Sequence, residues 1–232
     1  MLEPDLFNWC DVCGGREFKH SRVLWPALVS AWELSEDEAR YIDIQQGTHC
    51  AGCGSNVRSI ALARAIMRVR GHERFLTEFV SAPGQASLRV LEINEAGSLH
   101  PHLKQLPGHT LAWFPECDMT NLPFPDGAFD LVVHSDTLEH VADPLKGLRE
   151  CRRVLDGRGA LAFTVPVVPG RLSRSRAALP ASYHGCEGTT DPGMLVHTEF
   201  GADFWALVMR AGFSSCEVVS FHYPAGLGIL AR

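Results

Sequence analysis

The segment NLPFPDGAFDLVVHSDTLEHVADPLKGLRECRRVLDGRGALAFTVP, residues 121–166, decides the fold of this chain. It contains two short apolar runs, 130–134 and 160–165, each of a length typical of a buried strand. Between them, Asp143 followed by Pro144 predicts the N-cap and first position of a helix that continues to residue 155. Strand, helix and strand in this order predict part of an α/β sheet.

The regions around this segment continue the same alternation. The run LRVLEI, residues 88–93, predicts an earlier buried strand, residues 203–211 predict a helix, and residues 216–232 predict a terminal hairpin. We therefore predict a doubly wound, mostly parallel, Rossmann-like α/β sheet. Its ligand site is expected at the carboxyl ends of the strands.

In detail, residues 121–166 resemble the second half of the class I S-adenosylmethionine-dependent methyltransferase domain, in the type 11 branch. The resemblance rests on residues 129–133 as the fourth strand, on 137–141 as the leucine-glutamate-histidine-valine signature, and on 152–159 as the turn into the fifth strand. It implies S-adenosylmethionine as cofactor. It also implies that His134, Ser135 and Asp136 lie beside that cofactor, at the face where the substrate binds.

The turn after the first strand departs from the family pattern. The family has an acidic residue and then Gly-x-Gly-x-Gly, whereas this chain has Glu92 and then Asn94, Ala96 and Ser98 in the glycine places, with Gly97 between the last two. Asparagine adopts positive φ more readily than most residues, so the turn can persist. The resemblance implies that Glu92, Asn94 and Gly97 contact the cofactor.

The first half of the domain is also short. Only 25 residues separate Glu92 from Asp118, which fits one strand-helix-strand crossover but not two. We therefore predict a sheet shortened by one strand-helix unit, with a short helix in residues 99–108 and one strand in 109–118. The resemblance implies Asp118 and Met119 at the adenine and Glu116 in place of the ribose acid; the alternative is that both acids are ordinary loop residues.

Two C-x-x-C pairs near the N-terminus predict a structural zinc site. Each pair is followed by a glycine, which allows the tight turn beneath a metal ion, and the four thiolates are Cys10, Cys13, Cys50 and Cys53. A redox dithiol and unliganded thiols are the alternatives, but a redox role needs only one pair. Between the pairs, Ser35 and Glu38 form a capping box that predicts a helix.

A helix in residues 57–69 is predicted to link this zinc module to the larger domain. Its apolar residues have helical spacing, and Arg58, Arg64, Arg68 and Arg70 form its polar side. That side is either a solvated face or an anion-binding surface. We predict a zinc-binding module with its linking helix in residues 1–81 and a methyltransferase-like domain in residues 82–232.

The long segment 167–201 is the predicted substrate-binding loop, because loops of this length in a compact domain are usually functional. Arg171, Arg174 and Arg176 could clamp an anionic group, and His197 could assist them. His140, His184 and Tyr183 are the predicted catalytic residues, with a histidine as general base. For each of these residues a structural role is the alternative. A catalytic metal site is a further alternative, formed from His134, Asp136, His184, His197 and Glu199.

Composition narrows the functional classes. The chain has 232 residues, 46% hydrophobic and 21% charged, and a formal charge of −6 that argues against a general nucleic-acid binder. We expect no membrane span, no secretory signal and a cytoplasmic location, with a small molecule as partner and the oligomeric state open.

The leading hypothesis is methyl transfer to a small, anionic molecule such as a saccharide or a secondary metabolite. One alternative is a domain that has lost methyl transfer and serves as a binding or assembly subunit. The other is a repurposed metal-dependent enzyme.

Overall fold

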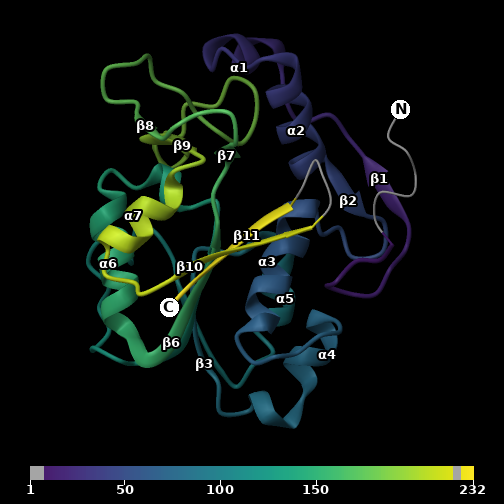
Figure 1. Ribbon diagram of the computed structural model, residues 1–232, viewed down its shortest axis with the longest axis vertical. Coiled ribbons are helices and arrows are strands. Elements are labelled where there is room, and N and C mark those ends of the chain that lie inside the picture. Colours follow the sequence, from purple (N-terminus) through teal and green to yellow (C-terminus); the bar gives the residue numbers. More distant parts are fainter. Residues whose placement is uncertain (1–7, 222–225) are drawn as a thin grey trace.

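A computed structural model describes residues 8–221 and 226–232 and shows a central six-stranded sheet between two layers of helices (Figure 1). The strands of this sheet are β3 (Arg89–Ile93), β4 (Gly108–Ala112), β5 (Phe129–Ser135), β6 (Leu155–Thr164), β10 (Cys216–Phe221) and β11 (Gly226–Ala231). Their spatial order is β10-β11-β6-β5-β3-β4. The pairs among β3, β4, β5 and β6 are parallel, whereas β11 is antiparallel to both β6 and β10. The mostly parallel, Rossmann-like sheet is thus confirmed.

The helices divide between the two faces of the sheet. The α-helices are α1 (Pro26–Ala31), α2 (Glu36–Gly47), α3 (Val57–Arg68), α4 (Leu76–Ser81), α5 (His100–Leu103), α6 (Pro144–Val154) and α7 (Phe204–Arg210). The 3-10 helices are η1 (Pro83–Gln85), η2 (Gly97–Leu99), η3 (Leu138–His140) and η4 (Pro192–Met194). In Figure 1, α3, α4 and α5 lie on one side of the sheet and α6 and α7 on the other. Each layer contributes to its own buried apolar cluster.

Helix α3 belongs to the packing of the central sheet. Its apolar face, including Ile60 and Ile66, is buried in the same cluster as residues of β3, β5 and β6. The contact with β11 is close: a Cβ at Gly228 would lie 2.4 Å from the carbonyl oxygen of Ala61, so only glycine fits there. The helix predicted to link the two modules therefore covers the sheet. The division of the chain at residue 82 stays a prediction.

The chain between β3 and β5 holds one helical segment and one strand, as the short spacing predicts. The strand is shorter than predicted. It ends at Ala112 rather than at residue 118, and an exposed loop with Trp113 and Phe114 follows. Because Pro115 has no N–H, it cannot continue the ladder. β4 lies on one side of β3 in the sheet, and the next strand in the sequence, β5, lies on the other side of β3. The order of the strands thus reverses between β3 and β5, and their carboxyl ends form the topological switch point.

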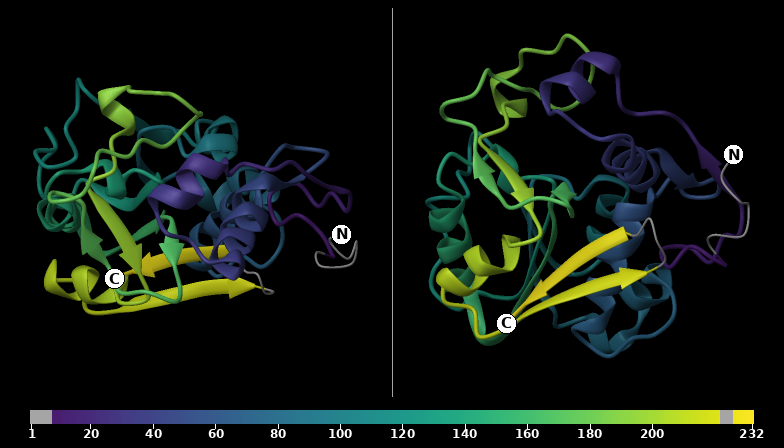
Figure 2. Two further views of the ribbon diagram at one scale, coloured as in Figure 1. Left: turned by 90° about the horizontal axis from the view of Figure 1, so that it is seen from above. Right: turned by 45° about the horizontal axis from the view of Figure 1, so that its top comes forward.

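Above this edge, the N-terminal segment meets the loop that follows β6 (Figure 2). That loop, predicted to lack regular structure, contains a small sheet of order β7-β9-β8, made of β7 (Val167–Val168), β8 (Arg174–Ser175) and β9 (Thr198–Gly201). On the N-terminal side, β1 (Phe18–His20) pairs with β2 (Thr48–Cys50). The indole N–H of Trp32 donates to Ser182 Oγ at 2.8 Å, and Arg171 forms an ion pair with Glu38. These contacts fasten the loop over the carboxyl edge of the sheet.

The predicted capping box at the start of α2 is present. Glu38 N–H donates to Ser35 Oγ, and Ser35 N–H donates to the Glu38 carboxylate. The terminal hairpin is also present, although its turn at 222–225 lies outside the described residues. Among the described helices, none combines the length and apolar character needed to cross a membrane.

Candidate functional site

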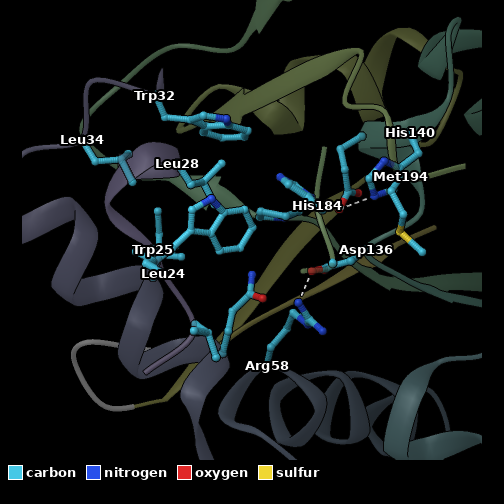
Figure 3. Close-up of a pocket in the computed structure, with 16 residues that line it drawn as sticks. Leu24, Trp25, Leu28, Trp32, Leu34, Arg58, Asp136, His140, His184 and Met194 are labelled. Carbon is cyan, nitrogen blue, oxygen red and sulfur yellow. Dashed lines mark hydrogen bonds and ion pairs between the residues drawn. The ribbon is translucent and has the colours of Figure 1, made fainter. Parts of the chain in front are cut away.

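A cavity of about 330 Å³ lies beside the carboxyl ends of β5 and β6, and residues that follow these two strands line it (Figure 3). One wall comes from the N-terminal segment and carries Trp25, Leu28 and Trp32, with other apolar side chains around them. The opposite wall is polar and consists of Arg58, Asp136, Glu139, His140 and His184. The segment expected to form a zinc module therefore also builds half of a binding cavity.

Asp136 is held in the polar wall by two donors. Arg58 of α3 and the Thr164 hydroxyl both donate to its carboxylate, the latter at 3.0 Å. Its φ of 45° turns the chain sharply at the end of β5. Burial raises the pKa of Asp136 to about 6, although the positive charge of Arg58 opposes the shift. Asp136 is thus an acid whose protonation can change near neutral pH.

Glu139, His140 and His184 converge beside Asp136. Glu139 Oε1 lies 3.6 Å from His140 Nε2 and 3.7 Å from His184 Nδ1, and the rings of the two histidines are nearly perpendicular with centroids 5.2 Å apart. Burial acts to raise the pKa of Glu139, but His184 and His140 together lower it. The carboxylate is therefore ionised although its residue is only 1% exposed. Figure 3 shows His140 and His184 directed toward the cavity.

His134 and Ser135 end β5 at the same edge. The His134 ring is fully buried, lies 4.9 Å from the ring of Phe163 and has no hydrogen-bond partner within the described chain. Burial lowers the pKa of His134 to about 4, so the ring is neutral. The Ser135 hydroxyl lies 2.9 Å from that of Thr164. Both residues support the carboxyl end of β5, but neither lines the cavity.

The turn after β3 keeps the left-handed backbone of a glycine-rich turn. Asn94 has φ of 53° and Gly97 has φ of 55°. The Asn94 side chain accepts a hydrogen bond from Phe114 N–H at 3.0 Å, which ties the turn to the loop after β4. No atom lies within 4 Å of the place that a Cβ at Gly97 would occupy, so the backbone there is open to a ligand.

The acid that precedes this turn points into the protein. Glu92 accepts hydrogen bonds from Ala96 N–H at 2.7 Å, from His100 Nδ1 at 2.8 Å and from His109 Nε2 at 2.6 Å. A carboxylate can only accept, so both ring nitrogens are donors. Glu92 therefore stabilises the turn from behind rather than lining the cavity.

The residues expected at the adenine lie beyond β4. Glu116 and Asp118 are exposed on the loop, four and six residues after the strand ends, so the prediction that they lie at a strand tip is wrong. Asp118 accepts a hydrogen bond from Thr120 N–H at 2.7 Å. Met119 is buried and packs beside Gly147. Their contact with a cofactor stays a prediction.

The predicted substrate-binding residues of the loop after β6 are mostly engaged with the protein itself. Arg171 pairs with Glu38, while Arg174 and Arg176 both pair with Glu199. The backbone N–H of His197 donates to the Glu139 carbonyl, and Tyr183 forms an isolated bridge with Leu195. Neither Tyr183, His197 nor any of these arginines lines the cavity, and their roles in binding or catalysis stay predictions.

The alternative metal set is only partly assembled. His184 and Asp136 line the same cavity, whereas Glu199 is committed to its two arginines. The carboxylate beside His184 is that of Glu139, which the sequence did not identify as a site residue, although it belongs to the leucine-glutamate-histidine-valine signature. The apolar wall was not predicted either. Arg58 was predicted to lie on the polar side of its helix, without a role in the site.

The four N-terminal cysteines come together. Their sulfur atoms all lie within 4.8 Å of one another, with Cys10 and Cys53 3.6 Å apart and Cys13 and Cys50 3.7 Å apart. Gly14 and Gly54, which follow the two pairs, have φ of 78° and 74°. The sequence-based grouping of these cysteines is thus confirmed.

Part of the chain is similar to known methyltransferases. Residues 49–163 match the family described as "Methyltransferase domain". The chain is 34% identical over 121 residues to a demethylmenaquinone methyltransferase of Clavibacter sepedonicus, which covers 47% of this chain and 49% of that protein. It is 35% identical over 103 residues to a malonyl-[acyl-carrier protein] O-methyltransferase of Geobacter sulfurreducens, and this match covers 44% of this chain and 37% of that protein.

Among solved structures, an S-adenosylmethionine-dependent methyltransferase from Aquifex aeolicus aligns with 85% of this chain and 98% of its own, at 14% identity and a TM-score of 0.44. The chain spans about half the length of the demethylmenaquinone methyltransferase and less of the malonyl-[acyl-carrier protein] O-methyltransferase.

Proposed function

We propose that the chain is an S-adenosylmethionine-dependent methyltransferase of class I, and that it transfers a methyl group from S-adenosylmethionine to a small molecule bound in the cavity beside Asp136. The observation that carries this proposal is the cavity itself, which lies at the carboxyl edge of the parallel strands, the edge where doubly wound sheets bind their ligands. It combines an apolar wall with a few convergent polar groups, as small-molecule sites do.

The open turn after β3 supports cofactor binding. Asn94 and Gly97 keep the backbone conformation that a glycine-rich turn needs, and the space beside Gly97 is free. When bound there, S-adenosylmethionine would supply an electrophilic methyl group. The tasks left to the protein are to align the nucleophile, to exclude water and to remove a proton.

The two walls of the cavity suit these tasks. Trp25, Leu28 and Trp32 would pack against the body of a substrate and exclude water. On the polar side, His140 or His184 would take the proton of the nucleophile, with Glu139 stabilising the charge that forms. Arg58 would keep Asp136 in place.

The substrate is proposed to be a small molecule with an apolar part and a nucleophilic oxygen or nitrogen. The two tryptophans favour the apolar part. For the rest of the substrate we propose an anionic group, as in a saccharide or a secondary metabolite.

We also propose that Cys10, Cys13, Cys50 and Cys53 bind a structural zinc ion. Zinc–sulfur bonds of about 2.3 Å in a tetrahedron set the sulfur atoms about 3.8 Å apart. The two shortest separations, 3.6 and 3.7 Å, fit this spacing. Four thiolates leave no open coordination position, so such an ion would stabilise the segment that forms the apolar wall.

Calorimetric titration with S-adenosylhomocysteine tests the proposed function. We expect one binding event per chain with a Kd on the order of micromolar, and no binding of ATP, which shares the adenosine but lacks the amino-acid part. If the folded protein binds no S-adenosylhomocysteine, methyl transfer is excluded for this chain.

A further inference from the structure

Glu139 is a buried charge that the described part of the chain leaves without a hydrogen bond. The residue is 1% exposed, and neither carboxylate oxygen has a hydrogen-bond partner. Burying an ionised carboxylate costs several kcal/mol unless a donor or a cation compensates it. Two histidine nitrogens approach this carboxylate without reaching hydrogen-bond distance, so the geometry leaves room for a ligand that binds all three groups.

The His140 ring is oriented as a metal ligand would be. Its Nδ1 lies 2.9 Å from the carbonyl oxygen of Leu195, and because a carbonyl only accepts, Nδ1 carries the proton. In the neutral ring, Nε2 then presents its lone pair toward Glu139 Oε1, 3.6 Å away. Histidines that bind metals almost always donate their other N–H to a carbonyl or carboxylate in this way.

The His184 ring completes the set from the opposite side. Its Nδ1 lies 3.7 Å from the same carboxylate oxygen, too far for a hydrogen bond. The ring packs on Trp32, with centroids 5.4 Å apart, and this contact fixes its direction. A carboxylate oxygen and two ring nitrogens thus surround one point at the wall of the cavity.

We propose that Glu139, His140 and His184 bind a divalent first-row transition-metal ion that coordinates and activates the methyl acceptor. Metal–ligand bonds of about 2.1 Å set neighbouring ligand atoms roughly 3.0–3.5 Å apart. The observed 3.6 and 3.7 Å need to shorten by only a few tenths of an ångström. Two histidines and one carboxylate bind such ions while leaving positions open for a substrate.

The proposal rests on the proposed function and narrows the substrate to a molecule with a metal-binding hydroxyl. Coordination would lower the pKa of the hydroxyl, so its proton leaves to solvent; His140 and His184 then hold the ion in place of acting as the base. An oxygen lone pair then forms the new bond to the methyl carbon, and the electron pair of the broken carbon–sulfur bond stays on sulfur. The products are the methyl ether and S-adenosylhomocysteine, and no oxidant is needed.

A second Glu-His-His set in the chain provides the control. Glu92, His100 and His109 also bring their ligand atoms together, but the Glu92 carboxylate already accepts three hydrogen bonds. We therefore expect no metal binding there.

Titration of the purified full-length protein with Mn²⁺, followed by the electron paramagnetic resonance signal of the free ion, tests the proposal. Mn²⁺ prefers oxygen and nitrogen ligands and does not compete for four thiolates. We expect one Mn²⁺ per chain for the native protein and for His109→Gln, and at least about 100-fold weaker binding for Glu139→Gln and His184→Ala. Co²⁺ is the second probe, and thiolate-to-cobalt absorption identifies any ion at the cysteines.

The proposal is overturned if the native protein binds neither ion outside the cysteines, or if Glu139→Gln binds as the native protein does. Loss of binding in His109→Gln with retention in Glu139→Gln would move the ion to the other set and equally refute it. Circular dichroism checks that each variant is folded. S-adenosylhomocysteine binding is measured separately: binding without Mn²⁺ uptake refutes only the metal site, and Mn²⁺ uptake without binding refutes only methyl transfer.

Discussion

Two Glu-His-His clusters lie near the neighbouring strands β3 and β5, and they differ in whether their carboxylates accept hydrogen bonds. Glu92, at the end of β3, accepts hydrogen bonds from a backbone N–H and two histidines. Glu139, in η3 after β5, is equally buried and has no hydrogen-bond partner within the described chain. The same residue types therefore give a completed structural network in one place and an open site in the other.

The difference follows from what each cluster borders. The Glu92 network supports the turn that begins at Asn94, and its three residues lie within 18 positions of one another, from 92 to 109. The Glu139 cluster faces the cavity and takes His184 from a distant loop. Stability requires the first carboxylate to be paired, whereas a ligand site requires the second to keep its acceptors free.

The largest effect is expected when the Glu92 network is broken. In Glu92→Gln, an amide N–H₂ faces donors that previously met a carboxylate, so we expect the free energy of unfolding to fall by about 3 kcal/mol. Urea denaturation measures the change. The control is Glu73→Gln, which alters an exposed acid outside the network and should change the free energy by less than about 0.5 kcal/mol. Equal effects of the two variants would mean that the network does not stabilise the turn.

The same substitution at Glu139 should cost less. No hydrogen bond is lost, and only the two longer ion pairs with His140 and His184 are removed, so Glu139→Gln should lower the free energy of unfolding by about 1 kcal/mol or less without metal. With Mn²⁺ at 100 times its Kd, the native protein should gain about 2.7 kcal/mol and the variant nothing. Denaturation with and without Mn²⁺ measures both numbers. A large loss of stability in the metal-free variant would show that Glu139 has a structural partner.

The contrast between the two clusters also shows which parts of the structure the sequence could predict. The elements from β5 to β6 were predicted from apolar runs and helix signals that are local, and the cysteine pairs from their spacing. The shortened sheet was predicted from the number of residues between Glu92 and Asp118. All these features are determined by residues that are close together in the sequence.

The cavity could not be predicted, because its parts meet only in three dimensions. The wall of Trp25 and Trp32 precedes the second cysteine pair, and nothing in the sequence indicates that it faces Glu139. The arginines of the loop after β6 resembled a binding site, yet Glu38 and Glu199 pair with them. Whether a charge meets a ligand or another charge of the protein depends on long-range packing.

A smaller effect is expected at the turn that the Glu92 network supports. Gly97→Ala should weaken S-adenosylhomocysteine binding about tenfold, or about 1.4 kcal/mol, because the methyl group enters the open space beside the turn. The matched control is Gly71→Ala. Gly71 has φ of 64° and equally open surroundings, but it lies after α3, away from the cavity. Both substitutions place alanine at a positive φ and therefore cause similar backbone strain. The S-adenosylhomocysteine affinities of the two variants, measured by calorimetry, should differ only if the ligand contacts the turn at Gly97. If the two affinities agree, the cofactor does not approach Gly97.

The smallest effect concerns the contact that holds the distant half of the Glu139 cluster. Arg171 pairs with Glu38 at 2.7 Å and thereby ties the loop that carries His184 to α2. Hydrogen bonding from Arg171 lowers the pKa of Glu38 from its ordinary 4.5 to about 2. Because the folded-state pKa is the lower one, the stabilisation is complete above about pH 4.5 and is lost as the pH falls toward 2. Glu38→Gln should therefore lower the free energy of unfolding by about 1 kcal/mol at pH 7 and leave it unchanged near pH 2.

The control Glu36→Gln removes an acid from the same first turn of α2 that does not contact Arg171. It therefore separates the effect of this ion pair from the effect of the helix dipole. Denaturation at several pH values in this window measures the difference. A deficit in Glu38→Gln that stays constant from pH 7 to pH 2 would show that the pair does not fasten the loop, and the hydrogen bond from Trp32 to Ser182 would then be the contact that does.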